Sequence, residues 1–249
     1  MMQTILKREP NLWIVEAMAQ EIIIENCILQ GVRTNAGEFL ADSVVITTGT
    51  FLNGLIHRGE NRIKAGRINE PPSVQLSFSL ADCQLELGRL KTGTPARLDK
   101  RTINWDDIPE QLGDDTIRKF SFWGTETRLP QVPCHIVYTN EVTHKIIRDN
   151  LHLSALYGGA IKGIGPRYCP SIEDKIVKFA QKDRHQVFLE PTGIGSNNFE
   201  IYPNGLSTSL PQEVQQAFYR SIAGLENVEM LQAGYAIEYD FVQPTELRS

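Results

Sequence analysis

The first fifty residues alternate between short apolar runs and polar turn residues, a pattern typical of β-strands. Asn35, Ala36 and Gly37 are turn-forming residues that separate the third run from the fourth. The pattern predicts an antiparallel β-meander. Its four apolar runs lie at residues 12–15, 21–25, 27–33 and 39–41.

The meander leads into a continuous apolar run at residues 43–50, which closes at Thr48 and Gly49. Such a run is typical of a strand buried on both faces in a parallel sheet. Ligands of doubly wound sheets bind beyond the carboxyl ends of these strands, so Thr48 and Gly49 are candidate dinucleotide contacts. The alternative is a plain strand end, because no strand is followed by Gly-x-Gly-x-x-Gly.

The middle of the chain combines glycine-rich loops with few regular elements. Residues 52–71 carry three glycines and predict a long loop. Helical spacing predicts a helix over 73–85, and residues 88–97 are expected to pass from a strand into a loop. Residues 99–133 are irregular, with 120–123 as the one expected strand.

The second half of the chain alternates strands with amphipathic helices. A helix is expected to open at Asn140 and to bury Val142, Ile146 and Ile147. Residues 193–205 are rich in glycine and asparagine and predict a loop. Strands are expected at residues 135–138, 186–189, 228–231 and 236–241.

Two further helices are preceded by the spacing of a capping box, in which the N-cap side chain and the side chain three residues later bond each other's backbone. Ser171 and Asp174 form one such pair, before apolar positions at helical spacing over 172–179. Ser209 and Gln212 repeat the spacing before the next helix.

Composition and charge are those of a globular protein. Of 249 residues, 41% are hydrophobic and 22% are charged. No run reaches the roughly 20 apolar residues of a membrane span, and no secretory signal opens the chain, so we expect no membrane association and a cytoplasmic location. The net charge of −5 argues against a general nucleic-acid binder.

The charge is unevenly distributed, because residues 58–101 carry +4 and the remainder −9. This basic segment is a candidate phosphate-facing surface, and the alternative is a solvated loop. Its cations near flexible glycines are Arg62, Lys64, Arg67, Arg89, Lys91 and Arg97.

Cysteine and histidine spacings predict no metal site. Cys27, Cys83, Cys134 and Cys169 are separated by at least 35 residues, so free thiols are expected rather than zinc ligands or a redox pair. The histidines show no paired spacing either. Cys27 and Cys83 are expected in the core.

Cys169 has the sequence context of a reactive thiol. It lies two residues before a predicted helix start at Ser171, where unpaired backbone N–H groups favour a thiolate, and Arg167 adds a positive charge. A glycine-rich turn at residues 163–165 precedes it. The alternative is a half-buried cysteine packed between Pro166 and Pro170.

Five motifs together resemble the MnmG (GidA) family over essentially the whole chain. They are Thr-Thr-Gly-Thr-Phe-Leu-Asn-Gly at 47–54, Gly-Arg-Leu-Lys-Thr-Gly-Thr-Pro at 88–95, Gly-Pro-Arg-Tyr-Cys-Pro-Ser-Ile-Glu-Asp-Lys at 165–175, Ile-Tyr-Pro-Asn-Gly at 201–205 and Gly-Tyr-Ala-Ile-Glu-Tyr-Asp at 234–240. The resemblance implies an FAD- and NADH-dependent enzyme that works with the GTPase MnmE on C5 of the wobble uridine (position 34) of tRNA. It further implies methylenetetrahydrofolate as one-carbon donor, and a homodimer.

The resemblance also implies roles for individual residues. Met18 and Ser73 stand where the family contacts FAD, and Cys169 matches a cysteine proposed as nucleophile, whose thiolate would add to C6 of uridine and make C5 carbanion-like. The implied nicotinamide-binding residues are Gly165, Pro166, Arg167, Tyr168, Cys169, Pro170, Ser171, Ile172, Glu173, Asp174 and Lys175.

The resemblance implies a mixed α/β fold: part of a glutathione-reductase-like FAD-binding domain with its β-meander, plus an inserted α/β nicotinamide-binding-like domain. The expected divisions are 1–97 and 231–249 for the FAD-binding part and 98–230 for the insertion. Family chains are more than twice as long, with an N-terminal Gly-x-Gly-x-x-Gly and a helical C-terminal part. We therefore expect an internal fragment that binds FAD weakly or not at all.

Two other functions stay open on the sequence. One is a TrmFO-like tRNA uridine C5-methyltransferase that depends on folate and FAD, which the Pro-Arg-Tyr-Cys-Pro-Ser motif at 166–171 disfavours. The other is a non-catalytic chain that binds tRNA or a partner through residues 58–101.

Overall fold

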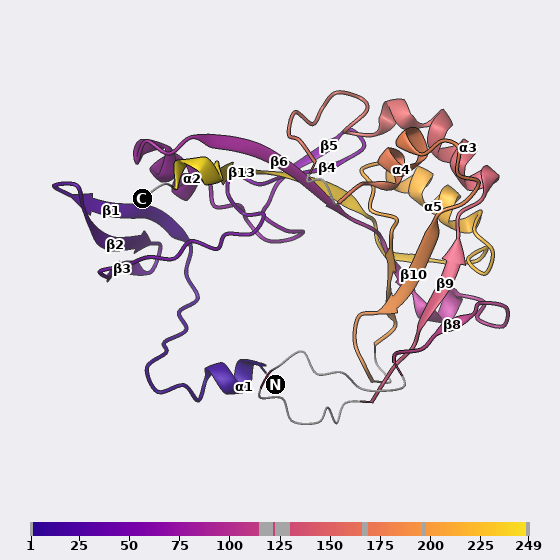
Figure 1. Ribbon diagram of the computed structural model, residues 1–249, viewed down its shortest axis with the longest axis horizontal. Coiled ribbons are helices and arrows are strands. Elements are labelled where there is room, and N and C mark those ends of the chain that lie inside the picture. Colours follow the sequence, from indigo (N-terminus) through magenta and orange to yellow (C-terminus); the bar gives the residue numbers. More distant parts are fainter. Residues whose placement is uncertain (1, 115–121, 123–129, 166–168, 196–197, 248–249) are drawn as a thin grey trace. The chain divides into compact units, whose positions relative to one another are not determined.

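The computed structural model describes residues 2–114, 122, 130–165, 169–195 and 198–247 (Figure 1). The chain divides into two compact units. The first comprises Met1–Gly54, Lys64–Gly88 and Tyr239–Ser249, and the second comprises Leu55–Ile63 and Arg89–Glu238. Each unit is built from segments that are far apart in the sequence.

The first unit contains the expected antiparallel meander and a helix packed on it. The strands β1 (Ala19–Glu25), β2 (Ile28–Thr34) and β3 (Gly37–Leu40) pair in that order. The helix α2 (Val74–Asp82) contacts β1, where the Ile22 amide donates to Ser79 Oγ at 2.8 Å. Leu52, Leu76 and Leu80 form the buried cluster, and a short helix α1 (Met2–Leu6) precedes the meander.

Two of the strand predictions in this unit are wrong. Residues 12–15 and 43–50 form no strand, and Val45 is 87% exposed. Apolar patterning measures a tendency to be buried, but a strand also needs a hydrogen-bonded neighbour. Within the described part of the chain, no strand pairs with residues 43–47.

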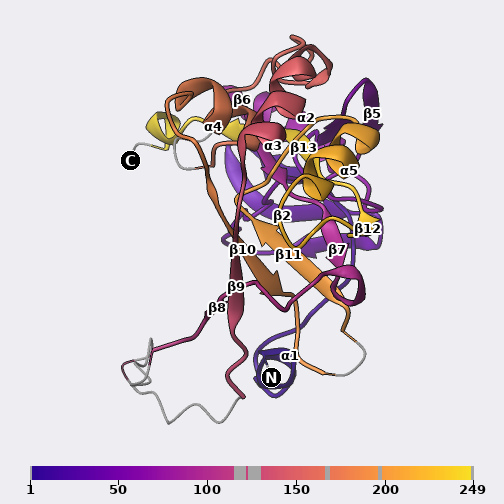
Figure 2. The ribbon, with the colours of Figure 1, turned by 90° about the vertical axis from the view of Figure 1, so that its right-hand side faces the viewer.

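The second unit is organised around a six-stranded sheet of order β12-β7-β11-β10-β9-β8, whose pairings are antiparallel. Figure 2 shows the strands β10 and β11 with the helices α3 and α5 of the same unit above them. In chain order, the strands are β7 (Arg97–Asp99), β8 (Glu110–Gln111), β9 (Cys134–Tyr138), β10 (Gln186–Pro191), β11 (Glu200–Asn204) and β12 (Met230–Gln232).

Three helices pack against one face of this sheet. A single hydrophobic cluster contains side chains of the strands and of all three helices. Leu98, Leu189 and Ile201 from the strands and Ile147 and Ile172 from the helices are all fully buried in it. The helices are α3 (Glu141–Asp149), α4 (Ile172–Lys178) and α5 (Gln212–Arg220). Short 3₁₀ turns lie at η1 (Lys100–Thr102), η2 (Leu151–Leu153) and η3 (Pro244–Glu246).

A third, four-stranded sheet has the order β5-β4-β13-β6. Its strands are β4 (Leu55–Arg58), β5 (Asn61–Lys64), β6 (Leu87–Thr94) and β13 (Tyr235–Val242). The prediction of a loop over 52–71 is therefore wrong for the β4–β5 hairpin, whose turn needs Gly59 at φ +55°. Gly59, one of the three glycines that indicated a loop, instead serves a tight turn.

Other differences in the second unit have local causes. Strand β11 lies inside the predicted loop 193–205, paired with β7 and β10. Val142 is 61% exposed, whereas Thr143 and His144 take the buried face of α3. Of the strand predicted at 120–123, all but Phe122 lies outside the described residues.

Helix α5 has no capping box. Its N-cap is Pro211, which has no side-chain oxygen, and Ser209 bonds elsewhere. The other predicted strands and helices occur within two or three residues of their expected ends. No helix among the described residues has the length and apolarity to cross a bilayer.

Leu189→Ala tests whether the cluster between the sheet and the three helices stabilises the second unit. Leu189 is fully buried, so the variant should lose about 2–5 kcal/mol of unfolding free energy in urea titrations. Leu231→Ala is the matched control on β12, because Leu231 is 51% exposed and should lose under about 1 kcal/mol. Equal losses would contradict this core assignment.

Candidate functional site

The segment around Cys169 belongs to the second unit and is described in two pieces, residues 163–165 and 169–175. Three of the predicted nicotinamide contacts, Pro166, Arg167 and Tyr168, lie outside the described residues. The effect of the Arg167 charge on Cys169 therefore stays a prediction.

The first piece runs beside β6. Ile164 forms a parallel bridge with Leu90. The Lys91 amide donates to Ile164 O at 3.0 Å, and the Ile164 amide donates to Arg89 O at 3.3 Å. At Gly165 an added Cβ would meet no atom closer than 4.0 Å, so the backbone there is open on the side of Lys91.

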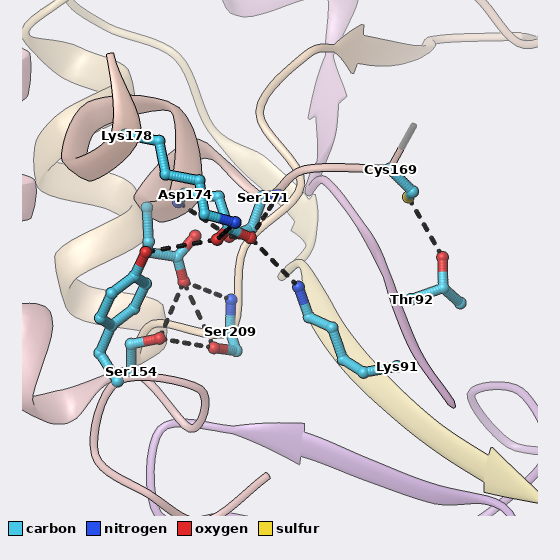
Figure 3. A network of polar contacts seen from close by, with 10 residues as sticks. Lys91, Thr92, Ser154, Cys169, Ser171, Asp174, Lys178 and Ser209 are labelled. Atoms are coloured by element: carbon cyan, nitrogen blue, oxygen red, sulfur yellow. Dashed lines mark hydrogen bonds and ion pairs between the residues drawn. The ribbon is translucent and has the colours of Figure 1, made fainter. Parts of the chain in front are cut away.

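Cys169 is half-buried and faces β6. Its Sγ lies 3.3 Å from Thr92 Oγ1, a contact in which either atom can donate (Figure 3). The thiol therefore has a hydroxyl partner, so packing between prolines is not its whole environment.

The capping box predicted at the start of α4 is confirmed. Ser171 Oγ accepts from the Asp174 amide at 3.2 Å, and Asp174 Oδ2 accepts from the Ser171 amide at 3.3 Å. Both residues are buried. The reciprocal bonds occupy two of the donors that an open helix start would offer to a ligand.

Asp174 is also the acceptor for cations from two elements. Lys178 Nζ lies 2.8 Å from Oδ1, and Lys91 Nζ lies 3.9 Å from Oδ2. Burial opposes ionisation of Asp174, but the Lys178 hydrogen bond, the Lys91 charge and the Ser171 amide outweigh it and lower the pKa of Asp174. The Tyr157 hydroxyl donates to Oδ1 at 3.3 Å, and burial followed by the Asp174 charge raises the pKa of Tyr157 to about 12.

Glu173 and Ile172 have their side chains in the interior. Glu173 is fully buried, and its Oε1 accepts from the Ser209 amide at 3.0 Å and from Ser154 Oγ at 3.1 Å. Its Oε2 is buried without a hydrogen-bond partner among the described residues. Ile172 belongs to the main hydrophobic cluster. The predicted ligand contacts of these two residues would therefore have to come from backbone atoms.

Lys175 joins the site to a second predicted motif. Its Nζ donates to the carbonyl oxygen of Gly205, in the Ile-Tyr-Pro-Asn-Gly motif. Burial lowers the pKa of Lys175, and a charged Cys169 opposes that shift. This bond ties α4 to the turn after β11, where Gly205 has φ +111°.

The other predicted cofactor contacts lie in the first unit. The Met18 amide donates to Asn35 Oδ1 at 2.8 Å, and Ser73 Oγ donates to Ala19 O at 2.9 Å. Thr48 and Gly49 begin a turn in which Thr48 O accepts from the Phe51 amide at 3.0 Å. Gly49 has φ +54°, and an added Cβ would meet nothing within 4 Å.

The remaining cysteines are free, and neither Cys27 nor Cys83 is among the buried core residues where both were expected. Cys27 is exposed, in a turn at φ +62°, so its prediction as a core residue is wrong. Cys83 and Cys134 are half-buried, and burial raises the pKa of each thiol, with a smaller contribution from Asp82 at Cys83 and from Glu190 at Cys134.

The six cations of the basic segment do not share one environment. Lys91 is buried, and Arg97 lies over the ring of Tyr202 at 4.5 Å with Glu200 at 3.5 Å. Lys64 and Arg67 belong to the first unit, whereas the other four of the six named cations belong to the second.

Sequence reasoning missed several residues that build the site. The motif Gly-Arg-Leu-Lys-Thr at 88–92 carried the signal for Lys91 and Thr92, but only as general basic charge. Ser209 was assigned to a cap, and nothing in the sequence indicated that Ser154 or Tyr157 would reach α4.

Comparison with known proteins decides the family. The family described as Glucose inhibited division protein A matches residues 1–249. The chain belongs to the GidA family. A curated GidA-family relative from Thermodesulfovibrio yellowstonii, named tRNA uridine 5-carboxymethylaminomethyl modification enzyme MnmG, is 55% identical over 248 residues. A protein of the same name from Aquifex aeolicus is 55% identical over 258 residues.

A solved GidA structure confirms the mixed α/β fold. The structure of Aquifex aeolicus GidA in its form I crystal has a TM-score of 0.89 and 55% identity, and the match covers 99% of this chain and 42% of that one. A form II crystal of the same protein gives a TM-score of 0.88. This chain spans about two fifths of the length of its curated relatives, 39% and 41% for the two named above.

Thr92→Val should change the reactivity of Cys169. If the Thr92 hydroxyl donates to the sulfur, its loss removes a hydrogen bond to the thiolate, and alkylation of Cys169 by iodoacetamide at pH 8 should slow about three- to tenfold. Peptide mass spectrometry would resolve each cysteine. Thr192→Val, on an exposed loop hydroxyl, is the control. An unchanged rate in Thr92→Val would contradict donation to sulfur.

Asp174→Asn should give a pH-dependent loss of stability. Because the folded-state pKa of Asp174 is lowered, its charge stabilises the fold fully above the unfolded value of about 3.9 and ceases to do so as pH falls through the lowered pKa. The difference in unfolding free energy between the wild type and the variant should therefore be largest near pH 7 and shrink below about pH 4. Urea titrations at pH 7 and pH 3 measure it, and a constant difference would contradict the pairing.

Proposed function

We propose that this chain forms part of an enzyme that modifies C5 of uridine 34 in tRNA. The observation that carries the proposal is the 55% identity, over 99% of this chain, to relatives named as tRNA uridine modification enzymes. The arrangement around Cys169 adds support, because it places a thiol beside a hydroxyl. The TrmFO-like alternative is not favoured, since the relatives carry the MnmG name.

The proposal assigns a cofactor role to each part of the chain. Residues 1–97 and 231–249 are proposed to belong to an FAD-binding domain, and residues 98–230 to a nicotinamide-binding insertion. NADH is the proposed reductant and methylenetetrahydrofolate the one-carbon donor. The GTPase MnmE is the proposed partner, and the assembly is proposed to be a cytoplasmic homodimer.

The described start of the Cys169 segment and strand β6 beside it fit a phosphate-bearing ligand in one respect. Gly165 leaves the backbone open beside the stem of Lys91, and Lys91 is a buried cation with Asp174 Oδ2 at 3.9 Å. Nicotinamide dinucleotides carry a pyrophosphate, which such a cation attracts. A hydride donor bound here would supply reducing equivalents, and the chain's own part is to bind and orient it.

The FAD fit is less complete within this chain. The Met18 amide, the Ser73 hydroxyl and the Thr48 carbonyl already have internal partners, so of the four predicted contacts only Gly49 has open space beside its backbone. We infer weak FAD binding by this chain alone, which a stoichiometric yellow flavin retained through purification would contradict.

The chemistry proposed for Cys169 is nucleophilic. Its thiolate forms a C–S bond to C6 of uridine, and the electron pair of the C5–C6 double bond moves to C5, which becomes able to attack a one-carbon unit. Loss of the C5 proton and departure of the thiolate then restore the double bond. Thr92 would hold the sulfur within hydrogen-bond range during this cycle.

Cys169→Ser, introduced with the rest of a GidA-family chain present, should abolish tRNA modification. A serine hydroxyl is a far poorer nucleophile at neutral pH, so we expect a rate loss of about a hundredfold or more. Cys134→Ser, a half-buried thiol on β9, is the matched control and should keep activity. Wild-type modification by Cys169→Ser would refute the nucleophile.

Binding by the isolated chain separates this proposal from a non-catalytic one. Measurable NADH binding in a calorimetric titration supports the nicotinamide-binding insertion. Salt-dependent tRNA binding with no NADH binding would instead favour a chain that only holds tRNA.

A further inference from the structure

A buried carboxylate outside the Cys169 segment holds the chain that enters it. Glu238 lies on β13, opposite Leu55 of β4, and is 4% exposed. Its Oε1 accepts two backbone hydrogen bonds, from the Lys162 amide at 2.9 Å and the Gly163 amide at 2.7 Å. All of these residues belong to the second unit. One oxygen atom thus fixes two successive peptide groups.

The second oxygen of Glu238 is paired with a histidine. Glu238 Oε2 lies 2.9 Å from His57 Nε2, and His57 is 1% exposed. Burial lowers the pKa of His57 against the opposing effect of Glu238, so the imidazole is neutral and Nε2–H donates to the carboxylate. His57 Nδ1 is buried with no partner among the described residues. Both Glu238 oxygens are satisfied by donors distant in sequence.

The space around Gly163 shows why this contact sets position. A Cβ built on Gly163 would lie 3.1 Å from the carbonyl carbon of Leu90 and 3.2 Å from Glu238 Oε1. Residue 163 is therefore confined between β6 and the carboxylate, and a side chain there would require Leu90 or Glu238 to move by a few tenths of an ångström. The next residue, Ile164, forms the bridge with Leu90.

This confinement determines what lies opposite the Cys169 segment. Once Ile164 is aligned with Leu90, the following β6 residues are Lys91, which faces Asp174, and Thr92, which contacts Cys169. A shift of residues 162–165 along β6 would change their register against Lys91 and Thr92, the two β6 residues that make these contacts. A buried polar pair such as Glu238 and His57 is weak evidence for a stabilising role, because apolar replacements often stabilise a protein as well. Fixing the position of residues 162–165 accounts for the pair better.

We propose that Glu238 is a positioning residue for the Cys169 site, and that its carboxylate, supported by His57, fixes residues 162–165 against β6. Only the chemical role of the Cys169 site, as a place where tRNA uridine is modified, rests on the proposed function. The contacts themselves are independent of any cofactor or tRNA.

The test uses the full chain and compares Glu238→Ala with Glu238→Gln. Alanine removes both acceptors. Glutamine keeps an oxygen for the two amides, and its NH₂ can donate to His57 Nε2 in the other tautomer. Glu226→Ala is the matched control, since Glu226 Oε1 also accepts from a glycine amide, that of Gly224 at 3.0 Å, but on the surface.

Two measurements report the position of residues 162–165 and of Cys169 and require no assay of enzymatic activity. Amide hydrogen exchange should accelerate at least tenfold at residues 162–164 in Glu238→Ala, and the alkylation rate of Cys169 should change at least threefold relative to Cys83 and Cys134. Glu238→Gln should restore both toward the wild-type values, and Glu226→Ala should leave both unchanged. A folded Glu238→Ala protein that matches Glu226→Ala in both would overturn the proposal.

Gly163→Ala keeps the test decisive if Glu238→Ala does not fold. Its added Cβ has to displace Leu90 or Glu238, so it should reproduce the faster exchange and the altered labelling. Gly93→Ala on β6 is its control, because a Cβ there meets nothing closer than 3.5 Å. If Gly163→Ala and its control Gly93→Ala gave the same exchange and labelling rates, the proposal would be overturned. Absence of NADH binding, by contrast, would count against the proposed function alone.

Discussion

Burial of a carboxylate is costly unless hydrogen bonds replace its water, and this constraint shapes the second unit around Cys169. Glu173, Asp174 and Glu238 are all buried there. Glu173 Oε1 accepts from two serines outside α4, and Glu238 accepts from two backbone amides beside β6. Asp174 pairs with Lys91 of β6 and also with groups at the start and end of its own helix. Residues 163–165 and 169–175 are therefore held by buried acceptors that bond to groups of other segments as well as to their own helix.

The sequence predicted local features well, because their partners are near in the chain. Ser171 and Asp174 form the capping box that their spacing indicates, and Asn35 turns the meander between β2 and β3. The same spacing at Ser209 and Gln212 predicted a cap that does not exist. Ser209 is bonded to Glu173, 36 residues away, and no local pattern encodes that competitor.

The wrong predictions of which side chains are buried also come from contacts between segments that are distant in the sequence. Val45 belongs to an apolar run that indicated a buried strand, yet it is exposed, because the described part of the chain offers no strand to pair with it. Lys91 shows the reverse error, since its charge predicted a solvated or phosphate-facing loop and its side chain is buried near Asp174. Hydropathy reports the preference of a residue, whereas burial depends on what the rest of the fold brings to it.

The candidate site was therefore predictable as a segment but not as a geometry. Its segment could be found because glycines, a cysteine and a helix start lie within thirteen residues. Its neighbours come from β6 and β13, which are distant from it in the sequence and were predicted only in part. The thiol of Cys169 acquires a defined environment because these strands fix both residues 162–165, which precede it in the chain, and the hydroxyl that contacts it. In this fold Glu238 does the first and Thr92 the second, so the chemistry available to Cys169 depends on residues that no motif around it contains.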